Sequence, residues 1–540
     1  MEKVRVERLD HLGVIAAVIN ELGLIDMINA RLVPDPQEVL TPGEAVAGMI
    51  LNGLGFANRP LSWTPQFFAS TPLDLLFHDG MRAEMFNRFK RGRTLDEADA
   101  YGCDLRFHEL ALCVCAREGI DLRCNHLDTT SFARSGEYIP ESDEQAMTIT
   151  HGDSRDHRPD LKQAVLELMV AQDGGSPFVS QSWDGHTSDI EIFQARAQAL
   201  VAALKTAPSP RYLIADSKLY HDDKAATLEN LGFITRIPHT IGSVSQVIRQ
   251  ALTGDTWHPL DEKTRYQRLE LCHYGIAQRW LVVHSQAALE RAEATVNHAR
   301  PREEAAIAQH LFHLQAQRFE TPEMAQEALA EVARSWTYHQ VESYNLIEHK
   351  RSARKGRPTP HTPLKAIAWQ IQAHAQPDQE ALEHRKQCQA CFVLGTNIDA
   401  RELSDPEVIR AYKGQSRVEG GFRFLKDPRF FVSSLLVKKP CRIQGLLMVM
   451  TLALLVYSVT QRRLRQQLAV HNEMVPNQIN QPTTAPTLRW VFQLLEGIHR
   501  VRVTAQGRVH DLIEGLNDVQ IKVLRQFGEP VCCLYQISPG

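Results

Sequence analysis

The stretch Leu122–Phe132, with the sequence LRCNHLDTTSF, decides how the fold is interpreted. Its first half predicts a short β-strand that ends in the acid Asp128. A second stretch, Arg211–Asp216 (RYLIAD), has the same form and also ends in an acid. A carboxylate at the end of a buried strand is costly unless it binds something. We therefore expect two strand ends that carry functional carboxylates.

The segments around these two strands complete the pattern of a sheet. Two apolar runs, 164–172 and 177–183, are separated by Asp173-Gly174-Gly175-Ser176, which is a hairpin signal. Helical periodicity follows at 190–204, and a further helix and strand are expected near 222–231 and at 233–237. Three strands, helix, strand, helix, strand is the order of an RNase H-like sheet. The predicted fold class is α/β, with an RNase H-like catalytic core in which helices flank a mixed sheet.

With 540 residues the chain should divide into several parts. The sequence predicts a core that is interrupted by a large α+β insertion and preceded by an all-helical domain for DNA-end binding or dimerisation. The predicted parts are the helical N-terminal domain 1–118, the first part of the core 119–240, the insertion 241–400, the second part of the core 401–475 and a helical C-terminal tail 476–540.

Two capping boxes are expected to begin helices in the N-terminal domain. They are Thr41-Pro42-Gly43-Glu44 and Thr94-Leu95-Asp96-Glu97. The basic run 88–93 between them is interpreted as a solvated loop, with a phosphate contact as the alternative.

Composition excludes a simple polycationic DNA binder, because the formal net charge is -4 and the pI is about 6.6. DNA contacts would come from local basic patches. The ten cysteines form no regular framework, which favours reduced thiols in the cytoplasm. The lone pair Cys388 and Cys391 is interpreted as structural thiols rather than a metal site. The N-terminus lacks a signal-peptide pattern, and the apolar run 445–457 predicts a buried helix rather than a membrane span.

A third candidate acid, Glu419, lies in a segment with helical spacing. Tyr412 and Gln415 precede it, and Arg423 and Lys426 follow it, at successive steps of three or four residues, so all should share its face. Such a stripe fits a groove for metal and DNA backbone. The alternative is an exposed helix in which Glu419 pairs with Arg423.

The chain resembles the DDE transposases of bacterial insertion sequences, in the branch with the signature Tyr-x2-Arg-x3-Glu-x6-Lys (YREK). Tyr412, Glu419 and Lys426 match this signature, whereas Gln415 stands in the place of its arginine. The contexts of Asp128 and Asp216 match as well, and so does the block 156–163. Gln415 can donate to a phosphate but brings no charge, which puts its backbone-clamping role in doubt.

The resemblance implies that Asp128, Asp216 and Glu419 are the catalytic residues and the metal ligands. They would hold two Mg²⁺ ions, for which Mn²⁺ can substitute, because phosphoryl transfer requires charge stabilisation on the attacking and leaving oxygens. The residues expected to contact DNA are Tyr412, Gln415, Arg423, Lys426, Arg158, Lys162, Lys350, Arg351, Arg354, Lys355 and Arg357. For the loop with Arg158 and Lys162, plain solvation is left open. Trp280 is interpreted as a core residue, with base stacking as the alternative.

The function implied is a transposase that binds terminal inverted repeats as a homodimer, cleaves the ends and joins the 3′-hydroxyls to target DNA. Its partners would be double-stranded DNA and a second copy, without a membrane, in the bacterial cytoplasm at the nucleoid. Two alternatives remain, namely a catalytically silent or domesticated DNA-binding derivative and an RNase H-like DNA nuclease.

Overall fold

The computed structural model describes residues 3–56, 63–134, 147–153, 158–204, 212–220, 228–254, 256–352, 364–427, 439–505 and 508–539. The chain forms two compact units. The first contains Met1–Thr235 and Glu407–Gly540, and the second contains Arg236–Pro406. The predicted insertion, 241–400, lies within the second unit.

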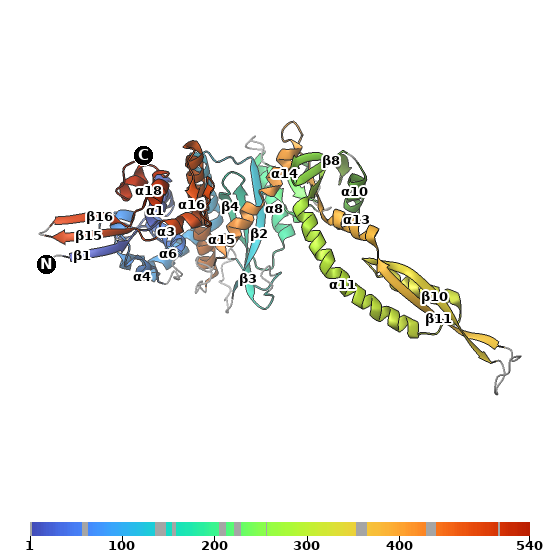
Figure 1. Ribbon diagram of the computed structural model, residues 1–540. Helices are drawn as coiled ribbons and strands as arrows, with labels where there is room; N and C mark the ends of the chain where they lie inside the picture. The colour runs from blue at the N-terminus through green and yellow to red at the C-terminus, as the bar shows by residue number, and fades with distance from the viewer. Residues whose placement is uncertain are drawn as a thin grey trace. The chain divides into compact units, whose positions relative to one another are not determined.

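The sheet of the first unit carries the strands that the sequence predicts (Figure 1). β2 (Cys124–Arg134) pairs antiparallel with β3 (Lys162–Ala171), which pairs antiparallel with β4 (Pro177–Trp183). On its other side β2 pairs parallel with β5 (Tyr212–Ala215), and β5 pairs parallel with β6 (Phe233–Arg236). The order β4-β3-β2-β5-β6 makes this a mixed sheet. The predicted α/β class is therefore confirmed. The prediction that the first strand ends at Asp128 is wrong, because β2 pairs with β3 up to Arg134 and Asp128 lies within the strand.

Local sequence explains the connections of this sheet. The β3–β4 turn contains Gly174 at φ 75° and Gly175 at φ 69°, a left-handed conformation that glycine adopts without a steric penalty. α8 (Asp189–Leu204) separates β4 from β5, as expected, and the short 3₁₀ helix η3 (Ser217–Leu219) follows β5. The expected helix near 222–231 lies mostly outside the described residues.

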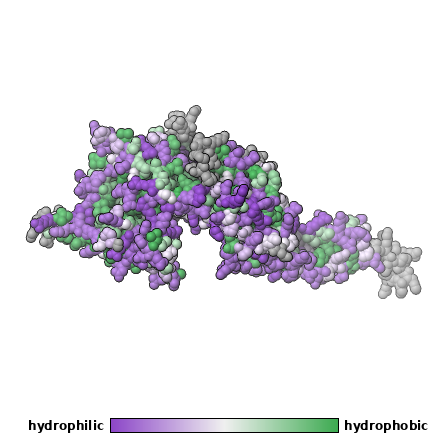
Figure 2. Space-filling view, turned by 90° about the horizontal axis from the view of Figure 1, so that it is seen from above, coloured by the Kyte–Doolittle hydropathy of each residue, from purple (hydrophilic) through white to green (hydrophobic). Residues whose placement is uncertain are grey.

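The core helix of the first unit is α16 (Pro440–Val470). Its length and mean hydropathy of 1.9 would allow it to cross a membrane, but 89% of its apolar window is buried inside the structure. It packs against α3 (Pro42–Leu54), α6 (Arg88–Tyr101), α7 (Cys103–Arg117) and β4. The predicted burial of the run 445–457 is confirmed. The face in Figure 2 is mostly hydrophilic, as expected when such apolar helices are enclosed.

One of the two predicted capping boxes is confirmed. The Thr41 side chain accepts a hydrogen bond from Glu44 N–H, and the Glu44 carboxylate accepts one from Thr41 N–H, at the start of α3. The second prediction is wrong, because Thr94 lies inside α6. That helix begins about two turns earlier, where the Asn87 side chain accepts from two backbone N–H groups.

The basic run before Thr94 is consequently helical rather than a loop. Lys90 is buried and forms an ion pair with Glu38, and the buried Arg91 donates to Thr64 Oγ1 at 2.9 Å. Tertiary partners satisfy these cations, which the local sequence did not indicate. Neither of them is exposed for a phosphate contact.

A three-stranded sheet corrects the predicted all-helical N-terminal domain and helical C-terminal tail. β1 (Lys3–Arg8) pairs antiparallel with β15 (His499–Ala505), which pairs with β16 (Arg508–Glu514). The buried Arg500 contacts the carboxylates of Glu7 and Asp74. A short strand at one chain end needs a partner from the other end, and periodicity does not reveal that pairing.

The remaining elements of the first unit are short helices around this core and a small two-stranded sheet. They are α1 (Leu12–Glu21), α2 (Leu24–Asn29), α4 (Thr64–Phe68), α5 (Leu73–Leu76), η2 (Ala83–Phe86), α14 (Asp405–Lys413, which starts at the boundary), α15 (Ser416–Leu425), β13 (Val475–Pro476), β14 (Pro482–Thr483), α17 (Leu488–Leu494), α18 (Asp518–Arg525) and α19 (Glu529–Leu534).

The second unit contains four strands in the order β12-β9-β8-β7. The run 266–285 predicts paired strands around Tyr274-Gly275, and the hairpin of β8 and β9 does turn at these two residues, both with positive φ. Trp280 on β9 is fully buried, in agreement with its interpretation as a core residue, and its Nε1–H donates to Gln278 Oε1 at 3.0 Å. The strands are β7 (His258–Asp261), β8 (Thr264–His273), β9 (Ile276–Ser285) and β12 (Cys391–Thr396).

Helices and a long hairpin complete the second unit. The charged run 287–333, with a break at Thr321-Pro322, predicts two helices, and the structure has α11 (Gln286–Ala316) and α12 (Pro322–Arg334) there. The sequence did not predict the hairpin of β10 (His339–Ser352) and β11 (Leu364–Pro377). Leu311, Leu329 and Ile371 belong to the apolar cluster between these elements. The other helices are α10 (Gly242–Thr253) and α13 (Gln379–Gln389).

His11 is a buried titratable group in the first unit. Its Nε2–H donates to Leu54 O at 2.8 Å, and its ring stacks on Phe492 with a centroid distance of 3.9 Å. Burial lowers the pKa of His11 from 6.5 to about 4, although the hydrogen bond to Leu54 opposes the shift. The folded protein therefore keeps this ring neutral where an unfolded chain would protonate it.

We predict that the free energy of unfolding decreases as the pH falls from 6.5 towards 4, because only the unfolded state takes up the proton over that range. The loss attributable to His11 is up to about 3 kcal/mol. Urea titrations followed by tryptophan fluorescence at several pH values would compare the wild type with His11→Gln, which does not titrate. Equal pH dependence in both proteins would contradict the assignment.

Candidate active site

Asp128 and Asp216 occupy equivalent positions at the sheet. β2 and β5 are parallel and in register, with Leu127 opposite Ala215, so each acid follows directly after that pair. Neighbouring strands are about 4.8 Å apart, which brings the two positions side by side. Both residues are partly exposed. The strand pairing therefore joins two acids that are far apart in the sequence.

Each of these carboxylates accepts a backbone hydrogen bond. Asp128 Oδ1 accepts from Thr129 N–H at 2.8 Å, and Asp216 Oδ1 accepts from Lys218 N–H at 2.9 Å at the start of η3. Such bonds stabilise the ionised form and restrict the side-chain rotamers. The two groups therefore present carboxylate oxygens side by side on neighbouring strands.

Glu419 lies on α15, which packs on the face of β2 that carries Asp128. Near the start of α15, Gly414 approaches His126, and at its end the Lys426 amine lies 5.8 Å from the centroid of the Phe132 ring. His126, Asp128 and Phe132 alternate by twos along β2, whose pairing with β3 shows no register shift, so they share a face.

The level of Glu419 along β2 follows from these two contacts. It lies five residues after Gly414, about 7.5 Å along a helix, while Asp128 lies two residues after His126, about 6.6 Å along a strand. Glu419 is therefore beside the level of Asp128. Its side chain is exposed, and in the described ranges it forms no ion pair with Arg423, contrary to the alternative interpretation of this helix.

The three acids are not gathered into a metal-binding group. Among the described residues, no set of three or more His, Cys, Asp or Glu side chains is arranged to hold an ion. This also applies to Cys388 and Cys391, of which the second is buried. Asp128 and Asp216 present the hard oxygen donors that Mg²⁺ prefers. The third acid is on α15, which packs on β2 and β3.

His126 lies two residues before Asp128 and is fully buried. Burial is the larger cause that lowers its pKa to about 4, and the charge of Arg417 lowers the pKa further. Neither ring nitrogen has a hydrogen-bond partner within the described part of the chain, and neither has Oε1 of the buried Gln415. A neutral, polar interior therefore separates the start of α15 from β2.

Comparison with known families decides the class of protein. The model of the family described as "Transposase DDE domain" matches residues 143–456, well over half of the chain. The chain belongs to this transposase family. The matched range includes Asp216 and Glu419, whereas Asp128 lies before the start of that range. Residues 4–112 match a family described as "Domain of unknown function (DUF4277)".

Comparisons of this transposase with curated proteins and with solved structures give less information. No curated protein matches it. A solved structure, the cryo-EM structure of piggyBac transposase synaptic complex with hairpin DNA, covers 92% of this chain and 82% of that chain. The sequence identity is 10% and the TM-score is 0.35. A TM-score at this level does not establish a common fold.

The residues of the transposase signature differ in their exposure. Tyr412 is half-buried near the end of α14, and Arg423 is exposed on α15. Gln415 is only 8% exposed, in the turn between these two helices, where it cannot present its amide on the surface with Arg423. The predicted single stripe is thus interrupted at Gly414 and Gln415, because the helix is broken there.

The other predicted DNA contacts lie in different places. Arg158 is exposed and forms a bidentate ion pair with Asp160, with bonds of 2.9 and 2.8 Å. Lys162 is half-buried at the start of β3. Lys350, on β10 of the second unit, is exposed and pairs with Glu348 at 2.8 Å. The backbone of Arg351 continues β10, and three further cations lie outside the described residues, namely Arg354, Lys355 and Arg357.

Sequence reasoning missed one acid next to the candidate site. Asp189, in the first turn of α8, accepts hydrogen bonds from Thr129 Oγ1 and from the Lys218 ammonium. It therefore connects the residue after Asp128 with the segment after Asp216. Its position in the first turn of a predicted helix was the available signal, but that position is common for acids with only a capping role.

We predict that Gly414→Ala destabilises the protein by about 1–3 kcal/mol, because a Cβ at Gly414 would lie 3.0 Å from His126 Nε2 and 2.9 Å from Ala411 O. Gly420→Ala, on the exposed side of α15, is the matched control. A Cβ there meets nothing within 4 Å, so no loss is expected and a gain of up to about 1 kcal/mol is allowed. Urea denaturation measures both, and equal stabilities would show that α15 does not pack tightly on β2.

Proposed function

We propose that the protein binds the terminal inverted repeats of an insertion sequence, cleaves the DNA ends and joins the 3′-hydroxyl ends to target DNA. The observation that carries the proposal is the register of β2 and β5, which places Asp128 beside Asp216 in a chain of the transposase DDE domain family. Two neighbouring carboxylates on rigid strands are suited to position divalent cations for phosphodiester chemistry.

The proposed metal ligands are Asp128, Asp216 and Glu419. When bound, Mg²⁺ or Mn²⁺ would neutralise the charge that develops on the phosphate oxygens. The protein's own contribution is to position the donors. Backbone N–H groups orient the two aspartates, and α15 carries Glu419 along the face of β2 to the level of Asp128.

We further propose that the chain has an RNase H-like core and the YREK-type signature of bacterial insertion-sequence transposases. Tyr412, Glu419, Arg423 and Lys426 would lie along the backbone of the transposon end. The buried Gln415 would not clamp a phosphate; it would instead support the turn that begins α15. The half-buried Lys426 would contribute its amine beside Phe132, on the strand that carries Asp128.

The proposed partners are double-stranded DNA, both transposon ends and target, and a second copy of the chain. Two ends must be held together for joining, which a homodimer would do. Exposed cations such as Arg158 and Lys350 would add phosphate contacts, although each now has an acidic neighbour that DNA would have to displace. The cytoplasm at the bacterial nucleoid is the proposed location.

The proposal predicts that Asp128→Asn, Asp216→Asn and Glu419→Gln each lower metal-dependent cleavage and strand joining at least about a hundredfold, because each removes a ligand that stabilises transition-state charge. The substrate is a linear duplex that carries the element's own ends, with Mg²⁺ present. Glu496→Gln changes an exposed acid far from the sheet edge in sequence and should retain activity.

Gel-shift binding of the same duplex, measured for every variant, separates loss of chemistry from loss of binding. Cleavage without joining would indicate a nuclease, and binding without cleavage in the wild type would indicate a silent derivative. Full activity of Asp216→Asn would refute the metal-ligand assignment.

A further inference from the structure

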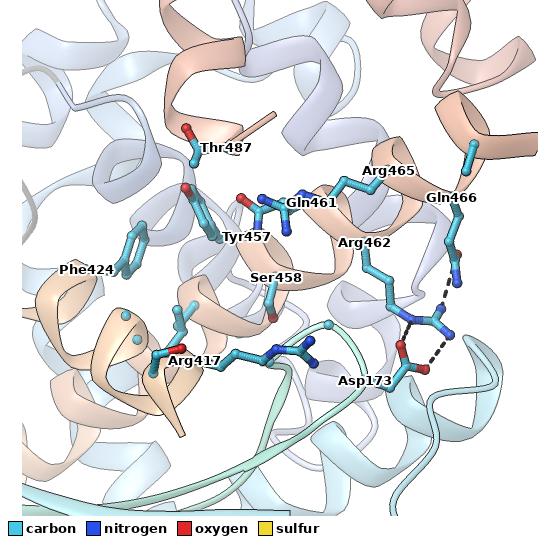
Figure 3. Close-up of a pocket in the computed structure, with 17 residues that line it drawn as sticks. Asp173, Arg417, Phe424, Tyr457, Ser458, Gln461, Arg462, Arg465, Gln466 and Thr487 are labelled. Carbon is cyan, nitrogen blue, oxygen red and sulfur yellow. Dashed lines mark hydrogen bonds and ion pairs between the residues drawn. The ribbon is translucent and has the colours of Figure 1, made fainter. Parts of the chain in front are cut away.

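A pocket of about 670 Å³ lies on the side of α15 away from Glu419, within the first unit. Residues of α15, of α16 and of the β3–β4 turn line it (Figure 3). Arg417 comes from α15, Arg462 and Arg465 come from α16, and Asp173 comes from the turn. Its volume is within the range of about 300–1,000 Å³ that is usual for sites of small organic ligands.

Positive charge exceeds negative charge in this pocket. Asp173 is the one carboxylate among the described residues that line it, and it forms a bidentate pair with Arg462, with bonds of 2.8 and 2.6 Å. Arg465 donates to Pro486 O at 2.9 Å, a neutral partner. The guanidinium of Arg417 has no hydrogen bond or ion pair in the described part of the structure. Two arginines are therefore left without a counter-charge.

The positive charge of Arg417 also acts on Arg465. Burial is the main cause that lowers the pKa of Arg465, and the positive charge of Arg417 lowers it further. Arg417 similarly lowers the pKa of His126 on the other side of α15. Cations that repel each other inside a cavity are stabilised by a bound anion, and arginine presents a planar fork that matches a phosphate.

The opposite side of the pocket is apolar and aromatic. The rings of Phe424 and Tyr457 pack together with centroids 4.6 Å apart, and Leu454 lies beside them. Figure 3 shows this pair on one side of the pocket and the pair of Asp173 and Arg462 on the other. The Tyr457 hydroxyl already accepts from Arg489 N–H at 3.1 Å. Such a wall suits a sugar or a base rather than a second charged group.

We propose that this pocket binds a nucleotide, with its phosphate on Arg417 and Arg465 and its sugar or base against Phe424 and Tyr457. The nucleotide is either free or part of a DNA strand, and the chemistry of recognition is the same for both. The inference goes beyond the proposed function, because it does not involve the carboxylates at the strand ends and holds for a chain that cuts no DNA.

The test is isothermal titration calorimetry of the full chain in EDTA, so that the carboxylates contribute no metal-dependent binding. The probes are dAMP, inorganic phosphate and a short single-stranded oligonucleotide. We expect dAMP or the oligonucleotide to bind, and Arg417→Gln and Arg465→Gln each to weaken binding about tenfold to a hundredfold. Arg525→Gln, which removes an exposed charge on α18, should leave the affinity within about twofold of wild type.

The probes also identify the source of the nucleotide. Binding of dAMP indicates a free nucleotide, and binding of the oligonucleotide without dAMP indicates a nucleotide of a DNA strand. Since Arg417 is exposed and without partners in the described residues, Arg417→Gln should melt like the wild type and keeps the test valid if Arg465→Gln is unstable. Absence of binding by both nucleotide probes, binding of inorganic phosphate alone, or unchanged affinity in Arg417→Gln would overturn the proposal.

Discussion

The parallel pairing of β2 with β5 is the constraint on which the rest of this structure depends. A parallel pair needs a crossover connection, and here β3, β4 and α8 lie between the two strands in the sequence. The backbone register then decides which residues become neighbours. Because Leu127 lies opposite Ala215, Asp128 and Asp216 meet at the same edge. A shift of one residue would turn one of the two acids to the other face.

The packing of helices on this sheet determines what surrounds the two acids. α16 is buried along much of its length and packs against α15, which in turn packs on β2. Gly414 allows the close approach to His126 on β2, and Gly421 allows α15 to pack against Leu454 of α16 and Leu168 of β3. The same helix then has two different sides. One side carries Glu419 towards the level of Asp128, and the other contributes Arg417 to the nucleotide-sized pocket.

Buried polar groups differ in whether a partner compensates them. Glu167, fully buried on β3, is paired with Arg196 and accepts a hydrogen bond from Trp183, so its charge is compensated. Arg500 is likewise compensated by Glu7 and Asp74. His126 remains neutral, and its ring nitrogens, like Oε1 of Gln415, have no hydrogen-bond partner among the described residues. The buried guanidinium of Arg106 on α7 also lacks a hydrogen-bond partner there, so such groups occur both beside α15 and away from it.

Local sequence was enough to predict the strand that contains Asp128, the strand that leads into Asp216, the β3–β4 and β8–β9 turns, the Thr41 cap and the buried helix around 445–457. These features depend on neighbours within a few residues, or on an apolar run long enough to require burial. Tertiary structure was needed to show that Lys90 and Arg91 are buried and that β1 pairs with β15. The tertiary structure also revealed the β10–β11 hairpin and the pocket lined by Arg417 and Arg465. In each of these cases the partner is distant in the sequence, and local periodicity carries no information about it.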